Sequence, residues 1–307
     1  MTKLFGIVFP QTSLYFLLPT SFRLMSIDPK RSREIFQKLE RDLVKLAARS
    51  QAHTVHRFRT GTRRLQILLS ELSPAPELNR SDKKLLKLLG RIRRRAGKVR
   101  DLDMQSAAMR SLKVPREARR KTQLVNRLIE LRGKQEKKLR KQLDKATVRE
   151  IRKRLKHAAK HVHPQAGCDP LAVAHVMLEA LHRTGVPLTE TVLHQYRILS
   201  KRARYTAEFA FPSPASEHLI VQIKQIQDAL GDWHDWLTLT QTAAAHLGDV
   251  RESPLVAELH NVTGAKYRRA IAVLSQIGTS PAPVPDQAAR HPVAAPVGAN
   301  AHTASAA

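Results

Sequence analysis

The chain has little cysteine, few aromatic residues and few acids. Its 307 residues include one cysteine, Cys168, so no disulfide can form within the chain, which fits a reducing compartment. Aromatic residues make up only 5%, which disfavours a sheet protein. No apolar run reaches the length of a membrane span. The 26 Asp and Glu residues are outnumbered by 54 Lys and Arg, which leaves a net charge of +28.

Motifs for catalysis or metal binding are also missing. There is no glycine-rich phosphate loop and no paired-carboxylate motif. His157, His161 and His163 have metal-like spacing, but they lie among cations without a nearby acid or cysteine, so we expect no metal and no cofactor. Cys168 has no credible catalytic partner in the sequence. We therefore expect a protein that is not an enzyme.

The positive charge is clustered. Residues 57–160 hold 34 of the 54 cations but only 10 of the 26 acids. Such a field attracts anions over long range, and its plausible partners are nucleic acid, an anionic membrane or a phosphate polymer. A solvated, lysine-rich surface is the simpler interpretation of a single charged run, but the clustering favours a polyanion.

The two ends of the chain differ from its middle. The segment 1–28 has an apolar stretch broken by prolines, and it is interpreted as an extension that begins upstream of the natural start at Met25, or as a weak signal peptide. Residues 278–307 are rich in Pro and Ala and predict a disordered tail. Asp28-Pro29 predicts a helix start, with an N-cap followed by proline at the first helical position.

Between the ends the pattern is helical throughout. A 3.6-residue period predicts helices over 29–49, 52–72, 81–111, 115–143, 147–162, 169–183, 189–210, 216–247 and 252–277. Proline- and glycine-rich segments separate most of them. With 42% hydrophobic residues, a chain of this length can bury a sizeable core, and the fold class is predicted to be all-α.

Two segments share one motif, His-x-aromatic-Arg-x-x-x-basic-Arg. The first covers residues 56–64 and the second 194–202. Positions i, i+3 and i+7 lie on one helix face, so each segment presents a histidine and two cations together. The opposite faces are apolar, through Phe58, Leu65, Leu69 and Leu72 in the first segment and Tyr196, Leu199, Ala203 and Ala207 in the second. Two such helices can enclose a basic groove.

A second element follows each motif at a similar distance. Its frame is a glycine followed three and four residues later by Arg100-Asp101 in one case and by His234-Asp235 in the other. The spacing from the motif histidine is 44 and 40 residues. Repetition in the same order predicts an internal duplication, with halves at about 29–163 and 165–277. A further basic ridge, formed by Arg91, Arg94, Arg95 and Lys98, is predicted opposite Leu85, Leu89, Ile92 and Ala96.

Together these motifs resemble the CHAD family, the conserved histidine α-helical domain, over about residues 29–277. The resemblance implies two antiparallel helical bundles related by a pseudo-twofold axis around a basic central cavity. It also implies binding of inorganic polyphosphate and cytoplasmic residence on polyphosphate granules, where other granule proteins are candidate partners. No Glu-x-Glu-x-Lys motif precedes Ser26, so we expect a CHAD domain without the triphosphate-tunnel (CYTH) domain of many relatives. The candidate polyphosphate-binding residues are His56, Arg59, Arg63, Arg64, Arg91, Arg94, Arg95, Lys98, Arg100, His194, Arg197, Lys201, Arg202, Arg204 and His234.

Some roles stay open at this point. His56 and His194 either contact phosphate directly or make structural hydrogen bonds as neutral side chains. Asp101 and Asp235 are expected to pair with Arg or His rather than to act as acids. Trp233 and Trp236 are expected in the core. The alternative functions are nucleic-acid binding, favoured by the basic helix over 115–143, and an enzyme of polyphosphate metabolism.

Overall fold

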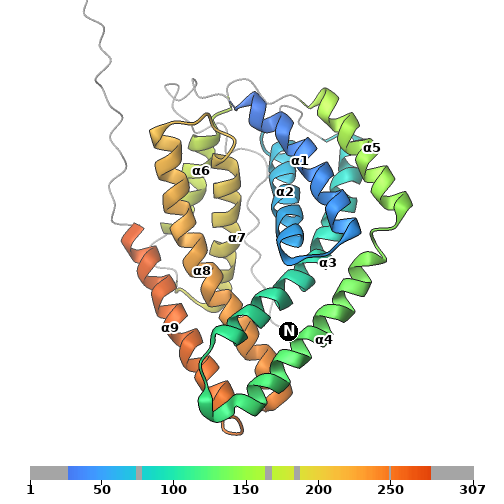
Figure 1. The fold of residues 1–307 in the computed structure, drawn as a ribbon. Helices are drawn as coiled ribbons and strands as arrows, with labels where there is room; N and C mark the ends of the chain where they lie inside the picture. The colour runs from blue at the N-terminus through green and yellow to red at the C-terminus, as the bar shows by residue number, and fades with distance from the viewer. Residues whose placement is uncertain (1–26, 74–77, 163–167, 183–186, 249, 278–307) are drawn as a thin grey trace, which may run out of the picture.

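The computed structural model describes residues 27–73, 78–162, 168–182, 187–248 and 250–277, and within them the expected all-α fold is confirmed. The predicted tail and all but the last two residues of the predicted N-terminal extension lie outside these ranges. The described α-helices are α1 (Pro29–Ala48), α2 (Ala52–Ser70), α3 (Arg80–Ser111), α4 (Ala118–Arg140), α5 (Lys145–His161), α6 (Pro170–Glu179), α7 (Glu190–Ala207), α8 (Pro214–Leu247) and α9 (Pro254–Ile277) (Figure 1).

The observed bounds differ from the predicted ones mainly at helix ends. Residues Pro115–Glu117 form a short 3₁₀ turn ahead of α4, and a second turn, Ala180–His182, follows α6. The helix predicted from residue 147 begins at Lys145, because Asp144 caps it by accepting a hydrogen bond from the Thr147 amide at 2.7 Å. The predicted cap at Asp28 is confirmed by a 2.8 Å bond from the Lys30 amide.

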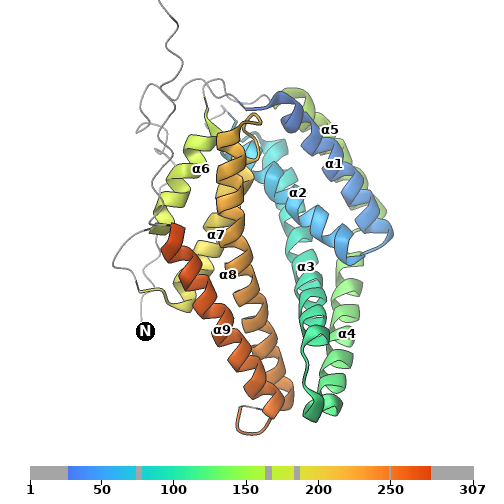
Figure 2. The same ribbon diagram turned by 60° about the vertical axis from the view of Figure 1, so that its left-hand side comes forward.

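The core is divided into three clusters of buried side chains. One joins α1, α2, α3 and α5, and a second joins α6, α7, α8 and α9. The third lies where the C-terminal parts of α3 and α8 meet α4 and α9, and it includes Met109, Leu124, Leu239 and Leu255. Figures 1 and 2 show these four helices converging at one end of the molecule. The third cluster therefore ties the bundles together at one end.

Helices α2 and α7 carry the two predicted motifs and contact each other between the bundles. The predicted apolar face of α2 is confirmed, since Phe58, Leu65, Leu69 and Leu72 are buried. On α7, Tyr196, Ala203 and Ala207 are buried and Leu199 packs against them partly exposed. Because each helix packs its apolar face into its own bundle, the charged faces of the two helices meet in the space between the bundles.

Polar contacts also join the bundles. Ile27 and Ala210 form an isolated β-bridge, and the Asp28 amide donates to the Phe209 carbonyl at 2.9 Å. Near the same place, Arg31 donates to two carbonyl oxygens that follow α7. Helix α1 is therefore anchored to the end of α7, and this contact positions α2 opposite α7.

Candidate functional site

A cleft between the bundles is lined by four helices and gathers cations from three of them. Its volume is about 170 Å³. The cleft is lined by His56, Arg59, Thr60 and Arg63 of α2, Arg100, Asp101 and Met104 of α3, Arg197, Lys201 and Tyr205 of α7, and Gly231 and Asp235 of α8. We call these residues the central cleft. Its five Arg and Lys side chains face only two carboxylates, so the site carries excess positive charge.

The central cleft contains two equivalent ion pairs, one from each bundle. Arg59 on α2 lies 3.6 Å from Asp101 on α3, and Arg197 on α7 lies 3.8 Å from Asp235 on α8. The prediction that the two aspartates pair with basic side chains is therefore confirmed. The pairs occupy matching positions in the two motifs, while the internal duplication itself stays a prediction. The distances are long for ion pairs with direct hydrogen bonds.

Several donors in the central cleft have no acceptor. The Nε atoms of Arg59 and Arg197 are buried and make no hydrogen bond within the described residues. Arg63 and Lys201 form neither a hydrogen bond nor an ion pair with any described side chain. A buried polar group without a partner costs free energy that an incoming acceptor recovers. The cleft is therefore built to receive hydrogen-bond acceptors that carry negative charge.

Burial, and after it mutual repulsion, lowers the pKa of several bases in and beside the cleft. Burial, followed by the nearby Arg197, Arg63 and Arg59, lowers the pKa of Lys201 to about 7. Burial and the same two α2 arginines lower the pKa of Arg93 to about 10, which places this α3 side chain beside the cleft. Burial also raises the pKa of the Asp235 carboxyl. Anionic ligands would reverse these shifts on the bases.

The histidines are held in the neutral form. Burial and the cations Arg100 and Arg59 lower the pKa of His56, which makes no hydrogen bond to another described residue. The rings of His194 and His234 lie 5.3 Å apart. Burial, together with Arg197 and His194, lowers the pKa of His234 to about 3. The hydrogen bond across the bundle that one interpretation of His56 requires is thus absent among the described residues, and phosphate contact stays a prediction.

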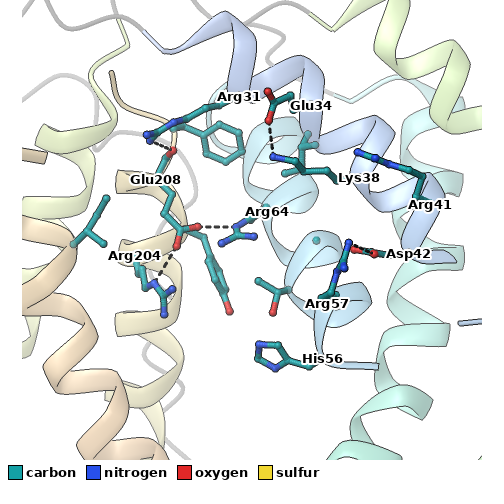
Figure 3. A pocket seen from close by; sticks show the side chains of 16 residues that line it. Arg31, Glu34, Lys38, Arg41, Asp42, His56, Arg57, Arg64, Arg204 and Glu208 are labelled. Carbon is teal, nitrogen blue, oxygen red and sulfur yellow. Dashed lines mark hydrogen bonds and ion pairs between the residues drawn. The ribbon is translucent and has the colours of Figure 1, made fainter. Parts of the chain in front are cut away.

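A larger pocket adjoins the central cleft. Its volume is about 670 Å³, and it shares His56, Thr60 and Tyr205 with the cleft. The remaining lining residues are Arg31, Glu34, Ile35, Lys38, Arg41, Asp42, Arg57, Gly61, Arg64, Arg204, Glu208, Phe209 and Ile220, from α1, α2, α7, α8 and the segment after α7 (Figure 3). We call this region the side pocket. The two hollows form one continuous basic surface.

Most cations of the side pocket already have carboxylate partners. Arg57 pairs with Asp42 at 2.9 Å, and Lys38 pairs with Glu34 at 2.5 Å. Glu208 accepts hydrogen bonds from Arg64 at 2.6 Å and from Arg204 at 3.0 Å. Figure 3 shows the Glu208 carboxylate between these two arginines, which come from different bundles. Most cations of the side pocket are thus paired within the chain, although the cations still outnumber the carboxylates that line it.

The predicted site residues divide into three groups. His56, Arg59, Arg63, Arg100, Arg197 and Lys201 line the central cleft, and Arg64 and Arg204 line the side pocket. His194 and His234 contact each other with their rings tilted by 47°, and neither lines the cleft. Arg202 lies outside both hollows, where its Nε donates to both carboxylate oxygens of Glu71 at 2.9 Å.

The predicted ridge on α3 lies apart from this surface. Arg91, Arg94, Arg95 and Lys98 line neither hollow, although the apolar line opposite them is buried as predicted. The α3 face that reaches the cleft carries Arg93, Gly97, Arg100 and Met104, spaced at three or four residues. The sequence does contain a signal for this face, since Arg93 precedes the Gly97 frame by one helical turn. Polyphosphate binding by the ridge stays a prediction.

Sequence patterns also missed the contribution of α1 to the side pocket. Arg31, Lys38 and Arg41 line it together with Arg57 of α2. Helix α1 carries no motif, and its position depends on contacts with residues almost two hundred positions away, such as the Arg31 bond to the Glu208 carbonyl at 2.8 Å. No local signal reports such a contact.

Two further features of the described residues concern metal binding and membranes. Among the described residues, no group of three or more His, Cys, Asp or Glu side chains is arranged to hold a metal ion. His161 instead lies 3.1 Å from Asp82, and His163 is outside the described residues. None of the described helices has the length and apolarity needed to cross a bilayer.

Comparison with known proteins identifies the family. No curated protein matches the chain. Two solved structures share its fold, the CHAD domain from the plant Ricinus communis and PptA from Streptomyces chartreusis. The first is 18% identical with a TM-score of 0.54, covering 80% of this chain and 89% of its own. The second is 17% identical with a TM-score of 0.55, covering 80% of this chain and 95% of its own. The CHAD domain family model matches residues 32–244, and the chain therefore belongs to the CHAD domain family.

Proposed function

We propose that the protein binds inorganic polyphosphate in the central cleft and has no catalytic activity of its own. The observation that carries this proposal is the pair of buried Nε donors of Arg59 and Arg197, which have no acceptor among the described residues and belong to opposite walls of a cleft with excess positive charge. Guanidinium groups match phosphate because their planar fork donates parallel hydrogen bonds to its oxygens. A chain of phosphates satisfies donors from both bundles at once.

The lining of the cleft favours a phosphate polymer over nucleic acid. Single-stranded nucleic acids are bound by aromatic side chains that stack on their bases. Tyr205 is the one aromatic ring among the residues that line the central cleft, apart from the His56 imidazole. Polyphosphate carries a similar density of charge without bases and needs only cations at repeated spacing. The family resemblance supports the same ligand.

The carboxylates of the cleft support binding without catalysis. Phosphoryl transfer commonly uses acidic side chains to hold metal ions. Asp101 and Asp235 each pair instead with an arginine. Phosphate release from polyphosphate, measured with and without Mg²⁺, tests this point. Release that depends on the intact cleft would make the protein an enzyme.

Association with cytoplasmic polyphosphate granules follows from the same affinity, and other granule proteins are proposed neighbours. A fluorescent fusion should collect on granules and disperse in cells that lack polyphosphate. A fusion that stays on the same bodies without polyphosphate would show that a protein partner, and not the polymer, recruits it.

The decisive experiment is a mobility or filter assay with polyphosphate of defined length and duplex DNA as competitor. We expect DNA in excess to leave the polyphosphate complex intact. We also expect affinity to fall steeply as salt rises, because each neutralised phosphate releases counterions. Displacement by DNA would favour the nucleic-acid alternative, and an affinity insensitive to salt would contradict the electrostatic basis of the proposal.

A further inference from the structure

Glu208 stands at a position where helix electrostatics disfavours a carboxylate. It is the C-cap residue of α7, where the partial negative charge of the helix end repels an acid. Its own backbone carbonyl accepts a bond from Arg31 at 2.8 Å. Its carboxylate therefore depends on other cations for stabilisation.

Those cations are one arginine from each bundle. Arg64 of α2 donates to Oε2 and Arg204 of α7 donates to Oε1, so each carboxylate oxygen serves a different bundle. Arg204 also donates to the Gln227 side chain at 3.0 Å, and the Arg64 guanidinium lies 5.7 Å from the centre of the Tyr205 ring. Both arginines are thus held in place, with Glu208 occupying the space between their donors.

A phosphate group bound between Arg64 and Arg204 would accept the same hydrogen bonds as the Glu208 carboxylate. A phosphate presents several anionic oxygens and accepts from two guanidinium groups in the same way that the Glu208 carboxylate does here. The position also lies on the route of a bound chain, because the side pocket joins the central cleft at His56, Thr60 and Tyr205.

We propose that Glu208 is a gating carboxylate that substitutes for a phosphate group in the side pocket and reserves Arg64 and Arg204 for chains long enough to extend there from the central cleft. This inference rests on the proposed function. A short phosphate has to displace Glu208 unaided and is confined to the cleft. A long chain is anchored in the cleft first, so its next phosphates reach the side pocket at high effective concentration.

The test compares Glu208→Gln with a matched variant, Glu34→Gln. Both substitutions remove one negative charge from the side pocket, but Glu34 pairs only with Lys38 one turn along α1 and joins no second helix. Isothermal titration is done with tripolyphosphate and with long-chain polyphosphate. Thermal unfolding confirms that each variant is folded.

The wild-type protein and Glu34→Gln should each bind one equivalent of tripolyphosphate. Glu208→Gln should bind a second equivalent and should bind long-chain polyphosphate about tenfold more tightly, because the two arginines no longer give up a charged hydrogen-bond partner. If Glu208→Gln fails to fold, Glu208→Asp takes its place in the titration. Its shorter side chain keeps the charge but cannot span both arginines, so the same second equivalent of tripolyphosphate is expected.

Three outcomes would contradict the proposed role of Glu208. A single equivalent of tripolyphosphate on the Glu208 variant overturns the gate. Equal effects of the two glutamine substitutions also overturn it, because net charge would then explain both. Wild-type protein that binds neither phosphate removes the proposed function and the gate together, and this failure is recognisable because it appears before any substitution is made.

Discussion

The central cleft and the side pocket are both basic, but they differ in how closely their cations pair with carboxylates. In the side pocket, Arg57, Arg64 and Arg204 bind carboxylates at 2.6 to 3.0 Å. In the central cleft, the two ion pairs are stretched to 3.6 and 3.8 Å, and Lys201 has no partner among the described residues. The same residue types therefore stabilise the fold in one region and remain available in the other.

This difference indicates that the central cleft, rather than the side pocket, gains free energy when an anion binds. Unpaired, partly buried charges cost stability in the free protein, and a ligand that neutralises them returns that cost as affinity. This cost is smaller in the side pocket, because its arginines pair with carboxylates at shorter distances. We therefore expect substitutions in the two regions to separate binding from stability.

The largest effect is expected from the cleft. Replacing Arg197 and Lys201 together with Ala should lower the affinity for long-chain polyphosphate by about a hundredfold or more, because each lost charged hydrogen bond is worth roughly 1.5 to 3 kcal/mol. The fold should survive, since neither side chain is needed to hold the bundles together. Isothermal titration and circular dichroism measure the two outcomes.

The matched control is the exposed pair Lys137 and Lys138 on α4. Its replacement with Ala removes the same charge from the basic helix that favoured the nucleic-acid alternative. We expect only a small loss. A loss equal to that of the cleft pair would move the binding surface to α4.

A smaller effect should follow from pH. The pKa of Lys201 is about 7 in the free protein, and a bound polyanion raises it. Below pH 7 the amine is charged in both states, whereas above pH 7 binding takes up a proton, so affinity should fall as pH rises from 7. One proton corresponds to at most about tenfold per pH unit. Titration in buffers of different ionisation enthalpy measures the uptake, and Lys201→Met should remove most of it.

A difference of the order of 1 kcal/mol should separate the two regions in stability. Lys201→Met should stabilise the free protein, because it removes an unpaired charge from the cleft. Arg64→Met should destabilise it by about 1 kcal/mol, because Glu208 loses one of its two partners. Urea unfolding measures both changes, and changes of the same sign would contradict the distinction between the regions.

The Lys201 contribution to stability has a defined pH window. Its pKa in the folded protein, about 7, is below the ordinary value of 10.5, so between these values the unfolded chain binds more protons than the folded one. Stability of the wild-type protein should therefore rise with pH across this window. The stabilisation by Lys201→Met should be full below pH 7 and absent above pH 10.5. If the difference in unfolding free energy between the two proteins were constant across this range, the charge of Lys201 would not be the cause of the destabilisation.

Much of the fold and half of the site were predictable because they depend on helical periodicity. The burial of Phe58 and Leu65 follows from their spacing, and so does the exposure of Arg59 and Arg63 toward the opposite bundle. The pairing of Asp101 and Asp235 with arginines also followed, because the two motifs repeat at similar distances.

The remaining features depend on contacts between distant segments. Arg64, Arg202 and Arg204 appear in the motifs as binding residues, but Glu208 and Glu71 hold them at the junction of the bundles. The ridge at Arg91 and Arg94 lies opposite the apolar line, whereas α3 lines the cleft through Arg100 and Met104. Periodicity defines a helix face but not the neighbour that it meets.

The most direct test of polyphosphate binding across both bundles is a double-mutant cycle with Arg59→Ala and Arg197→Ala, measured as affinity for long-chain polyphosphate. If one chain contacts both arginines, each single substitution should cost a large part of the bridging affinity, and the double variant should lose clearly less than the sum of the two losses. Strictly additive losses, or a single variant that binds as well as the wild-type protein, would contradict a site shared by the two bundles.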